Sequence, residues 1–279
     1  MRISELYGNG CLILKNAGVD NYRNEARWIF EAVFECGNEY LLFNSSAEAD
    51  SVKAATYLDK IKERSDGIPV QYVIGSWDFY GESYAVGKGV LIPRPETELL
   101  VDFALDYLEN KANAVVYDLC SGSGCIGISI ARNKPDAEII LVEKSSDALG
   151  YLNRNVKDSE CKNIRVVNGD VLLGYDSFDL PKPDLVLSNP PYIESDDIKK
   201  LQSEVLHEPL MALDGGADGM VFYNAISEKW INECSAVAVE CGEGQADSIV
   251  KLFSKKFADV YSVKDFNGIE RVVVGRERI

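Results

Sequence analysis

The residues AVVYDLCSGSGCIGISIARN, at positions 114–133, decide the fold of this chain. An apolar run ends at Asp118, a turn with glycines at 122 and 124 follows, and an apolar helical segment begins near Gly127. Because glycine has no side chain, a ligand can approach the backbone amides of such a turn at the start of a helix. This stretch therefore predicts a strand, a turn that binds a polar or anionic ligand, and a helix.

Strand-like and helical segments alternate from Val115 to the end of the chain. After the first strand come the apolar runs EIILVE (138–143), IRVVN (164–168), DLVLSN (184–189), AVAVE (236–240) and RVVVG (271–275). Strands separated by helices predict an α/β domain with a doubly wound, mostly parallel sheet that is covered on both faces. Ligands of such sheets bind beyond the carboxyl ends of the strands, so the polar residues that end each strand are candidate site residues.

The first third of the chain has a different pattern. Apolar residues recur at helical spacing in 25–34 and 54–61, which predicts a small helical domain over residues 1–67. Residues 68–92 are rich in aromatic and β-branched residues and contain four glycines, which predicts a β-hairpin linker. The α/β domain is then predicted over residues 93–279.

The composition is that of a globular chain with an acidic excess. Of 279 residues, 45 are acidic and 29 are basic, and the resulting net charge of −16 opposes nonspecific attraction to phosphate. Free nucleic acid and membranes are not expected as partners, and the lack of a signal-like or spanning segment predicts a cytoplasmic protein. Seven scattered cysteines and one histidine show no zinc spacing, so no metal site is expected.

Three strand-end carboxylates bear on which ligand the glycine turn binds. The glycines fit G-x-G-x-x-G, and Glu143 ends the second strand, where it can accept the ribose hydroxyls of NAD or of S-adenosylmethionine. Asp118 precedes the glycines, where its charge would repel a pyrophosphate but attract the ammonium or sulfonium half of S-adenosylmethionine. Asp170 follows the third strand and is placed to accept from an adenine amino group. The methyl donor is the favoured ligand, and a nicotinamide oxidoreductase is the weaker alternative.

The sequence Asn189-Pro190-Pro191-Tyr192 directly follows the strand DLVLS. The two prolines fix the backbone and remove two amide donors, so the carbonyls of Asn189 and Pro190 remain free to accept hydrogen bonds. The Asn189 side-chain oxygen and the Pro190 carbonyl can hold both hydrogens of a planar NH2 group, and Tyr192 supplies a face for that group. This grip raises electron density on the nitrogen as it attacks. The motif therefore predicts methylation of a planar, sp2-bonded nitrogen.

Together with three further segments, these motifs closely resemble the HemK/PrmC family, the protein-glutamine methyltransferases that modify peptide chain release factors. The similarity covers nearly the whole chain, in GIPVQYVIGSWDFYGESYAV (67–86), VLIPRPETELLV (90–101), DLCSGSGCIGISIA (118–131), NPPYI (189–193) and HEPLMALDGGADG (207–219). The second and the last of these segments are long and specific to the family. The glycine loop and NPPY are shared with many amino-methyltransferases.

The resemblance implies a seven-stranded, Rossmann-like class I methyltransferase fold. It also implies methyl transfer from S-adenosyl-L-methionine to the side-chain amide nitrogen of the glutamine in a release factor's Gly-Gly-Gln motif, with the helical domain helping to hold the protein. The implied cofactor-binding residues are Asp118, Cys120, Ser121, Gly122, Ser123, Gly124, Glu143, Asp170 and Asn189. The implied catalytic residues are Asn189, Pro190 and Tyr192, and the substrate-binding set adds Pro191, Arg94 and Glu98. Phe79 and Tyr80 either border this site or pack in the core.

The sequence departs from the family pattern at three positions. Cys120 stands where Gly is usual, Glu143 where Asp is more common, and Val171 where some members carry an aromatic residue beside adenine. A cysteine at position 120 is expected to take an ordinary φ and to add bulk beside the ligand. The glycines that follow retain the turn.

Two other functions stay open at this point. An adenine-N6 methyltransferase acting on DNA or RNA would use the same motif, because adenine presents the same planar NH2 group once flipped from its stack. A catalytically inactive binding module is the other. His207 has no identifiable partner as a general base, and Cys120 and Cys125 lack a basic neighbour to activate a thiolate. A monomer is expected.

Overall fold

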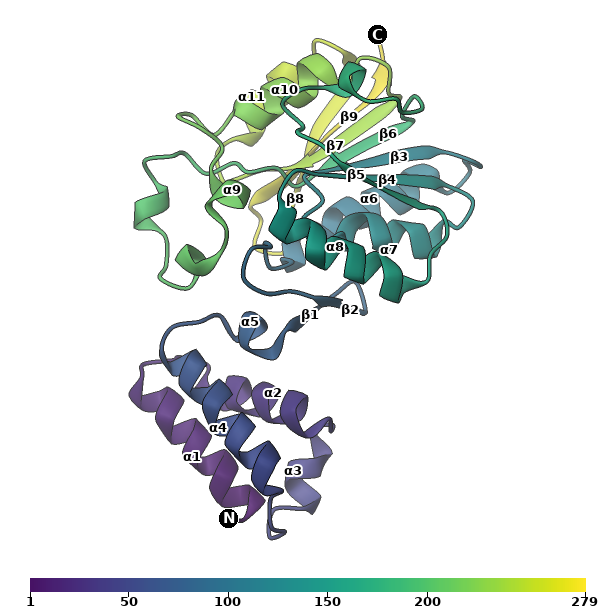
Figure 1. The fold of residues 1–279 in the computed structure, drawn as a ribbon. Coiled ribbons are helices and arrows are strands. Elements are labelled where there is room, and N and C mark those ends of the chain that lie inside the picture. The colour runs from purple at the N-terminus through teal and green to yellow at the C-terminus, as the bar shows by residue number, and fades with distance from the viewer. The chain divides into compact units, whose positions relative to one another are not determined.

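The computed structural model describes residues 1–279 without a gap, and the chain divides into two units (Figure 1). One unit contains residues 1–76 and 202–207, and the other contains residues 77–201 and 208–279. Residues 202–207 therefore belong to the first unit, although the residues before and after them belong to the second.

The second unit is built on one seven-stranded sheet, in the order β5-β4-β3-β6-β7-β9-β8. Its strands are β3 (Val115–Leu119), β4 (Glu138–Glu143), β5 (Ile164–Asn168), β6 (Leu185–Ser188), β7 (Ala236–Glu240), β8 (Phe257–Lys264) and β9 (Glu270–Arg278). The first five strands are parallel, whereas β9 is antiparallel to both β7 and β8. The predicted mostly parallel, seven-stranded α/β sheet is confirmed.

Helices cover both faces of this sheet (Figure 1). They are α6 (Glu98–Leu108), α7 (Cys125–Asn133), α8 (Ser146–Ser159), α10 (Val221–Lys229) and α11 (Ala246–Phe253). The unit also contains the short helix α9 (Leu210–Leu213) and the 3-10 turns η1 (Pro95–Thr97), η2 (Tyr175–Ser177) and η3 (Ile198–Lys200). Alternate residues of each strand point to opposite faces. Leu187 and Ala238 therefore pack with α6 and α7, while Val186 and Val239 pack with α10 and α11.

The first unit is a bundle of helices, as its sequence predicts. Its helices are α1 (Ile3–Asn16), α2 (Tyr22–Phe34), α3 (Glu39–Phe43), α4 (Ser51–Ser65) and α5 (Val70–Ile74), and the 3-10 turn η4 (Val205–His207) also belongs to it. Residues at helical spacing, among them Leu6, Ile29 and Tyr57, form its buried core. Arg64 is also buried there and forms ion pairs with Glu25 and Glu204.

The segment 68–92 contains both a helix and a hairpin. The hairpin, β1 (Ser76–Phe79) with β2 (Glu82–Ala85), agrees with the sequence pattern. The helix α5 was not predicted, and it forms because Val70 and Val73 complete the core of the helical unit. The domain boundaries at 67/68 and 92/93 stay predictions. None of the helices is both long and apolar enough to cross a membrane.

Candidate active site

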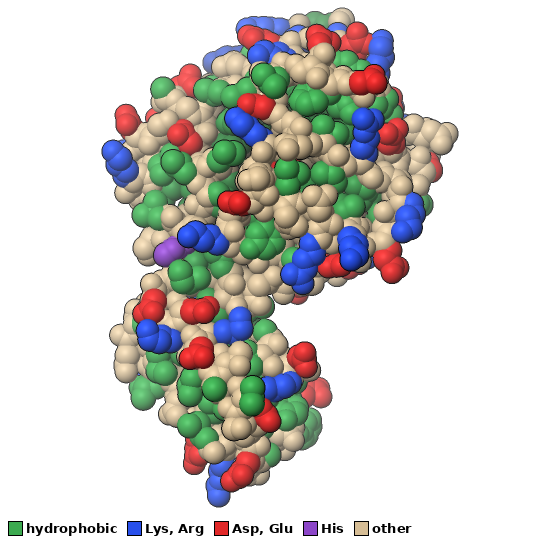
Figure 2. All heavy atoms as spheres, in the orientation of Figure 1, with side chains coloured by type: hydrophobic (Ala, Val, Ile, Leu, Met, Phe, Trp, Pro, Cys, Tyr) green, Lys and Arg blue, Asp and Glu red, His purple; other side chains and the backbone are tan.

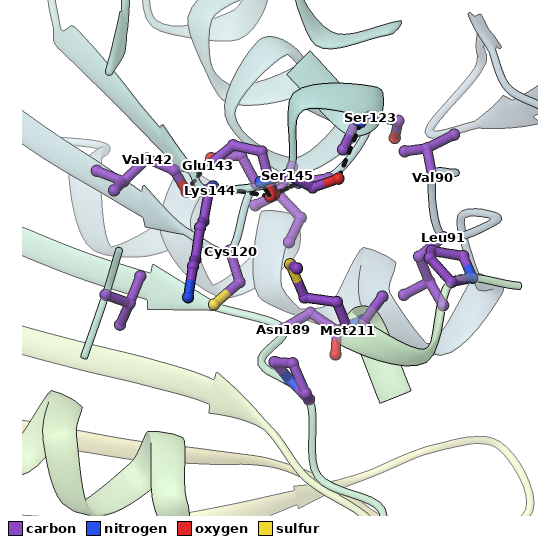
Figure 3. A pocket seen from close by; sticks show the side chains of 18 of the residues that line it. Val90, Leu91, Cys120, Ser123, Val142, Glu143, Lys144, Ser145, Asn189 and Met211 are labelled. Carbon is purple, nitrogen blue, oxygen red and sulfur yellow. Dashed lines mark hydrogen bonds between the residues drawn. The ribbon is translucent and has the colours of Figure 1, made fainter. Parts of the chain in front are cut away.

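A pocket opens at the carboxyl ends of β3, β4, β5 and β6 (Figure 3). Its walls include residues 89–94, 120–123, 142–145 and 169–172, together with Thr97, Asn189, Pro191 and parts of 209–222. In the view of Figure 3, Cys120 lies between the side of the pocket formed by Glu143 and Lys144 and the side formed by Asn189 and Met211. The sheet topology thus brings strand ends that are far apart in sequence to one place.

The glycine turn after β3 is held closed by Ser121. The Ser121 hydroxyl donates to the Asp118 carbonyl at 2.6 Å, and its amide donates to the Val142 carbonyl at 3.1 Å. Within this turn Cys120 adopts a φ of 59° and Gly122 a φ of 55°. The expectation of an ordinary φ at Cys120 was wrong, because the closed turn requires the left-handed region here. Glycine takes that conformation without strain, so it is the better residue at this position.

Glu143 joins the glycine turn to the start of α8. One carboxylate oxygen accepts from the Gly122 amide at 2.8 Å, and the other accepts from the amides of Lys144 and Ser145 at 2.8 and 2.7 Å. Each carboxylate oxygen can accept more than one hydrogen bond, so Glu143 retains acceptor capacity toward the pocket that it lines.

Asp118 lies behind the turn and does not line the pocket. Its side chain is fully buried, with one oxygen accepting from the Gly127 amide at 3.0 Å and the other without a partner. Burial and, to a smaller extent, the charge of Glu143 raise the pKa of Asp118 to about 7, although the hydrogen bond from the Gly127 amide lowers it. An unpaired buried oxygen of this kind is a site for a bound water or for a cationic donor on a ligand.

Asp170 lines the pocket and is paired with Lys144, which no motif of the sequence indicated. Lys144 Nζ lies 2.8 Å from one carboxylate oxygen, and the other oxygen accepts from the Leu172 amide at 2.9 Å. Burial alone would raise the pKa of Asp170, but these two hydrogen bonds lower it below its ordinary value. The carboxylate therefore stays ionised. Val171, which is buried, forms part of the same wall.

Asn189 and Pro191 line the pocket directly after β6, whereas two other residues of the motif do not. Pro190 is buried, and Tyr192 packs against the core of the α10 and α11 face. The Tyr192 carbonyl accepts from Gln245 Nε2 at 2.9 Å. Burial raises the pKa of the Tyr192 phenol, so it stays protonated at neutral pH. The proposed face for a planar group at Tyr192 stays a prediction.

The predicted residues of the LIPRPETE segment divide between the pocket and the structure behind it. Arg94 lines the pocket and forms an ion pair with the buried Glu208. Glu98 begins α6 and accepts from the Tyr80 amide at 2.7 Å, away from the pocket. Phe79 is in the core, and the Tyr80 hydroxyl donates to Asp102 at 2.8 Å. Gly124 and His207 do not line the pocket either.

Two further side chains beside Asn189 were not selected from the sequence. Thr97 lines the pocket and accepts from Asn189 Nδ2 at 3.1 Å. Its hydroxyl donates to Glu240 Oε2 at 2.5 Å. The available signal was the position of Glu240, which ends the strand AVAVE and is a strand-end acid like Glu143.

Glu240 makes stability depend on pH. Burial raises its pKa from 4.5 to about 7, so the folded state binds a proton more tightly than the unfolded state. Stability from this group is full below pH 4.5 and is lost as pH rises to about 7. We expect Glu240→Gln to raise the free energy of unfolding at pH 8 by up to about 3 kcal/mol, because glutamine does not ionise. Urea unfolding at pH 4.5 and pH 8 checks this, and an equal effect at both values would contradict it.

Comparison with known proteins identifies the family. Residues 97–229 match the model of the methyltransferase small domain, and residues 5–75 match that of the PrmC N-terminal domain. A release factor glutamine methyltransferase of Thermodesulfovibrio yellowstonii is 37% identical over 84% of this chain and 85% of its own length. That of Clostridium acetobutylicum is 33% identical over 98% of each chain. This chain belongs to the release factor glutamine methyltransferase family.

The fold of this release factor glutamine methyltransferase family member is shared with more distant enzymes. The solved catalytic domain of hMettl16, in complex with MAT2A 3'UTR hairpin 6, superposes with a TM-score of 0.58 at 14% identity, over 81% of this chain and 82% of that one. At this identity the likeness shows the methyltransferase fold alone. The enzyme class comes from the relatives of higher identity and from the family model, which place the pocket in an enzyme of the methyltransferase class.

Proposed function

We propose that this protein transfers a methyl group from S-adenosyl-L-methionine to the side-chain amide nitrogen of the glutamine in the Gly-Gly-Gln motif of a peptide chain release factor. The observation that carries the proposal is the position of Asn189 and Pro191, directly after β6 and in the wall of the pocket. Relatives named release factor glutamine methyltransferases, matching nearly the whole chain, support the choice of substrate.

The residues around the pocket fit S-adenosylmethionine. Glu143 can accept the ribose hydroxyls, and Asp170 can accept from the adenine amino group while it stays paired with Lys144. Val142 and Val171 offer apolar walls of the kind that pack against a base. Asp118 lies behind the glycine turn, so its unpaired oxygen would reach the ammonium group of the methionine part only through a water. When bound, the cofactor supplies an electrophilic methyl carbon on a sulfonium sulfur.

The chain supplies orientation and electrostatic stabilisation. The Asn189 side-chain oxygen and the Pro190 carbonyl accept the two hydrogens of the glutamine amide, which fixes its plane and aims its nitrogen. Methylation of the amide nitrogen would develop positive charge on its N–H groups. The two acceptors stabilise this charge more in the transition state than in the ground state. The nitrogen then loses one proton to water.

The remaining expectations follow from this activity. The partner is a release factor, so we place the protein in the cytoplasm with the translation machinery, and we propose that it acts as a monomer. Lys and Arg side chains are dispersed among acidic ones on the face shown in Figure 2. We therefore do not propose free nucleic acid as a partner.

Mass spectrometry of a recombinant release factor, incubated with the protein and S-adenosylmethionine, tests the proposal. We expect a gain of one methyl group on the glutamine of the Gly-Gly-Gln motif, and none in a release factor with that glutamine replaced by alanine. No gain, in a protein that binds the cofactor by calorimetry, would overturn it. In that case methylation of adenine in DNA or RNA would be tested next, under low-salt conditions that favour such binding.

The cofactor part of the proposal makes a separate prediction. Glu143→Gln is expected to raise the Kd for S-adenosylmethionine by about 10- to 100-fold, because hydrogen bonds to a charged acceptor contribute about 1.5–3 kcal/mol. Calorimetric titration measures this. The matched control is Glu138→Gln, at the exposed start of the same strand, which should leave Kd unchanged. An unchanged Kd in the Glu143 variant would remove the residue from the cofactor site.

A further inference from the structure

The side chains of Asn189, Thr97 and Glu240 form a hydrogen-bond network that begins at Asn189. Its Nδ2 lies 3.1 Å from Thr97 Oγ1, which in turn lies 2.5 Å from Glu240 Oε2. Thr97 and Glu240 are each only 2% exposed, so water does not compete for these bonds. Neither residue has a role in the function proposed above.

The sheet brings these residues together. Strands β6 and β7 are parallel neighbours, with Ser188 opposite Val239, so Asn189 and Glu240 occupy the next position at the same edge. Side chains alternate along a strand, and Leu187 and Ala238 face α6. Asn189 and Glu240 therefore also face α6, at whose start Thr97 lies.

The chemistry of the three groups determines which of them donates and which accepts in each hydrogen bond of this network. Above pH 7, where Glu240 is ionised, its carboxylate only accepts, so the Thr97 hydroxyl must give its single proton to Glu240. Thr97 then has only lone pairs left for Asn189, which must present its NH2 group. This requirement fixes the orientation of the Asn189 amide. It leaves the Asn189 side-chain oxygen directed away from Thr97 and free for another donor.

We propose that Thr97 and Glu240 are positioning residues that hold the Asn189 amide in the one orientation that can accept from the substrate amide. This inference rests on the proposed function. If the Asn189 amide turned over, it would place its own NH2 group against the NH2 group of the glutamine, donor against donor. The Thr97–Glu240 pair excludes that orientation, and Glu240 acts on the substrate only through Thr97 and Asn189.

Paired substitutions at Thr97 provide the kinetic test. Thr97→Val keeps the shape of the side chain but removes the hydroxyl, whereas Thr97→Ser keeps the hydroxyl. At pH 8.5, above the pKa of about 7 to which burial raises Glu240, we expect Thr97→Val to lower kcat about tenfold. The KM for S-adenosylmethionine should stay within about twofold, and Thr97→Ser should recover most of the rate.

A second readout does not need the release factor. The side-chain NH2 resonances of Asn189, assigned by their loss in Asn189→Ala, should shift upfield in Thr97→Val and stay in place in Thr97→Ser. If the buried carboxylate prevents Thr97→Val from folding, the double variant Thr97→Val with Glu240→Gln removes that charge and is compared with Glu240→Gln alone.

Three results would overturn the inference. The first is full activity in Thr97→Val, and the second is a kcat in Thr97→Ser that is no higher than that in Thr97→Val. The third is a rise in the KM for the cofactor in Thr97→Val with kcat unchanged, which would make Thr97 a direct cofactor contact. Failure of the proposed function can be told apart from failure of this inference, because in the first case the wild-type protein would methylate no release factor. The resonances of Asn189 would still report whether Thr97 holds its amide.

Discussion

Asn189→Ala is expected to lower the rate of release factor methylation by about 10²- to 10³-fold. The substitution removes the side-chain oxygen that accepts one hydrogen of the glutamine amide in the proposed mechanism. Removal of one preorganised group that stabilises developing charge has an effect of this size in other enzymes. The loss should fall on kcat, because the contact strengthens as the nitrogen becomes positive. Single-turnover kinetics with saturating cofactor and release factor measure it.

The control for this variant is another asparagine in the same unit. Asn267 is exposed in the turn between β8 and β9, and its side chain makes no hydrogen bond. Asn267→Ala should keep the wild-type rate. An Asn189→Ala protein with wild-type kcat would refute the role of the side chain. An equal loss of cofactor affinity would instead place Asn189 in cofactor binding alone.

Much of the fold follows from sequence pattern alone. The alternation of apolar strands with helices predicted the mostly parallel sheet, and the known edge at which such sheets bind ligands predicted that Glu143, Asp170 and Asn189 would meet. The structure places all three in one pocket. The strand β8 was not predicted, because polar residues such as Ser262 and Lys264 interrupt its apolar pattern.

What the sequence could not predict depends on side-chain direction and strand order. Glu240 ends a strand that was recognised, but its meeting with Thr97 requires that β6 and β7 be neighbours. Tyr192 follows the prolines, yet only the packing of its ring decides between the pocket and the core. Cys120 takes a left-handed φ because of tertiary hydrogen bonds to the turn, which no local preference of cysteine would suggest.

Gly215→Ala should lower kcat about a hundredfold although Gly215 does not line the pocket. A methyl group at this position would lie 2.7 Å from Tyr192 Cα and 2.9 Å from the Pro191 carbonyl oxygen. These are backbone atoms, which cannot turn aside as a flexible side chain can. Gly215 also donates to the Ile193 carbonyl at 2.8 Å, so it is held against the motif. The prolines would have to move, and displacements of about 1 Å cost this much in rate.

Gly150→Ala separates this effect from a general sensitivity to alanine. Gly150 is exposed in α8, and an added methyl group would meet no atom within 4 Å. Alanine there should keep the rate and raise the free energy of unfolding by up to about 1 kcal/mol, because it is the better helix former. Gly215→Ala should lower stability by about 1–3 kcal/mol, remain folded, and keep cofactor affinity within a few-fold, since the walls at Glu143 and Asp170 are untouched. A folded Gly215→Ala protein with wild-type kcat would show that the loop after β6 tolerates displacement, and the requirement for a fixed Asn189-Pro190 geometry would then be wrong.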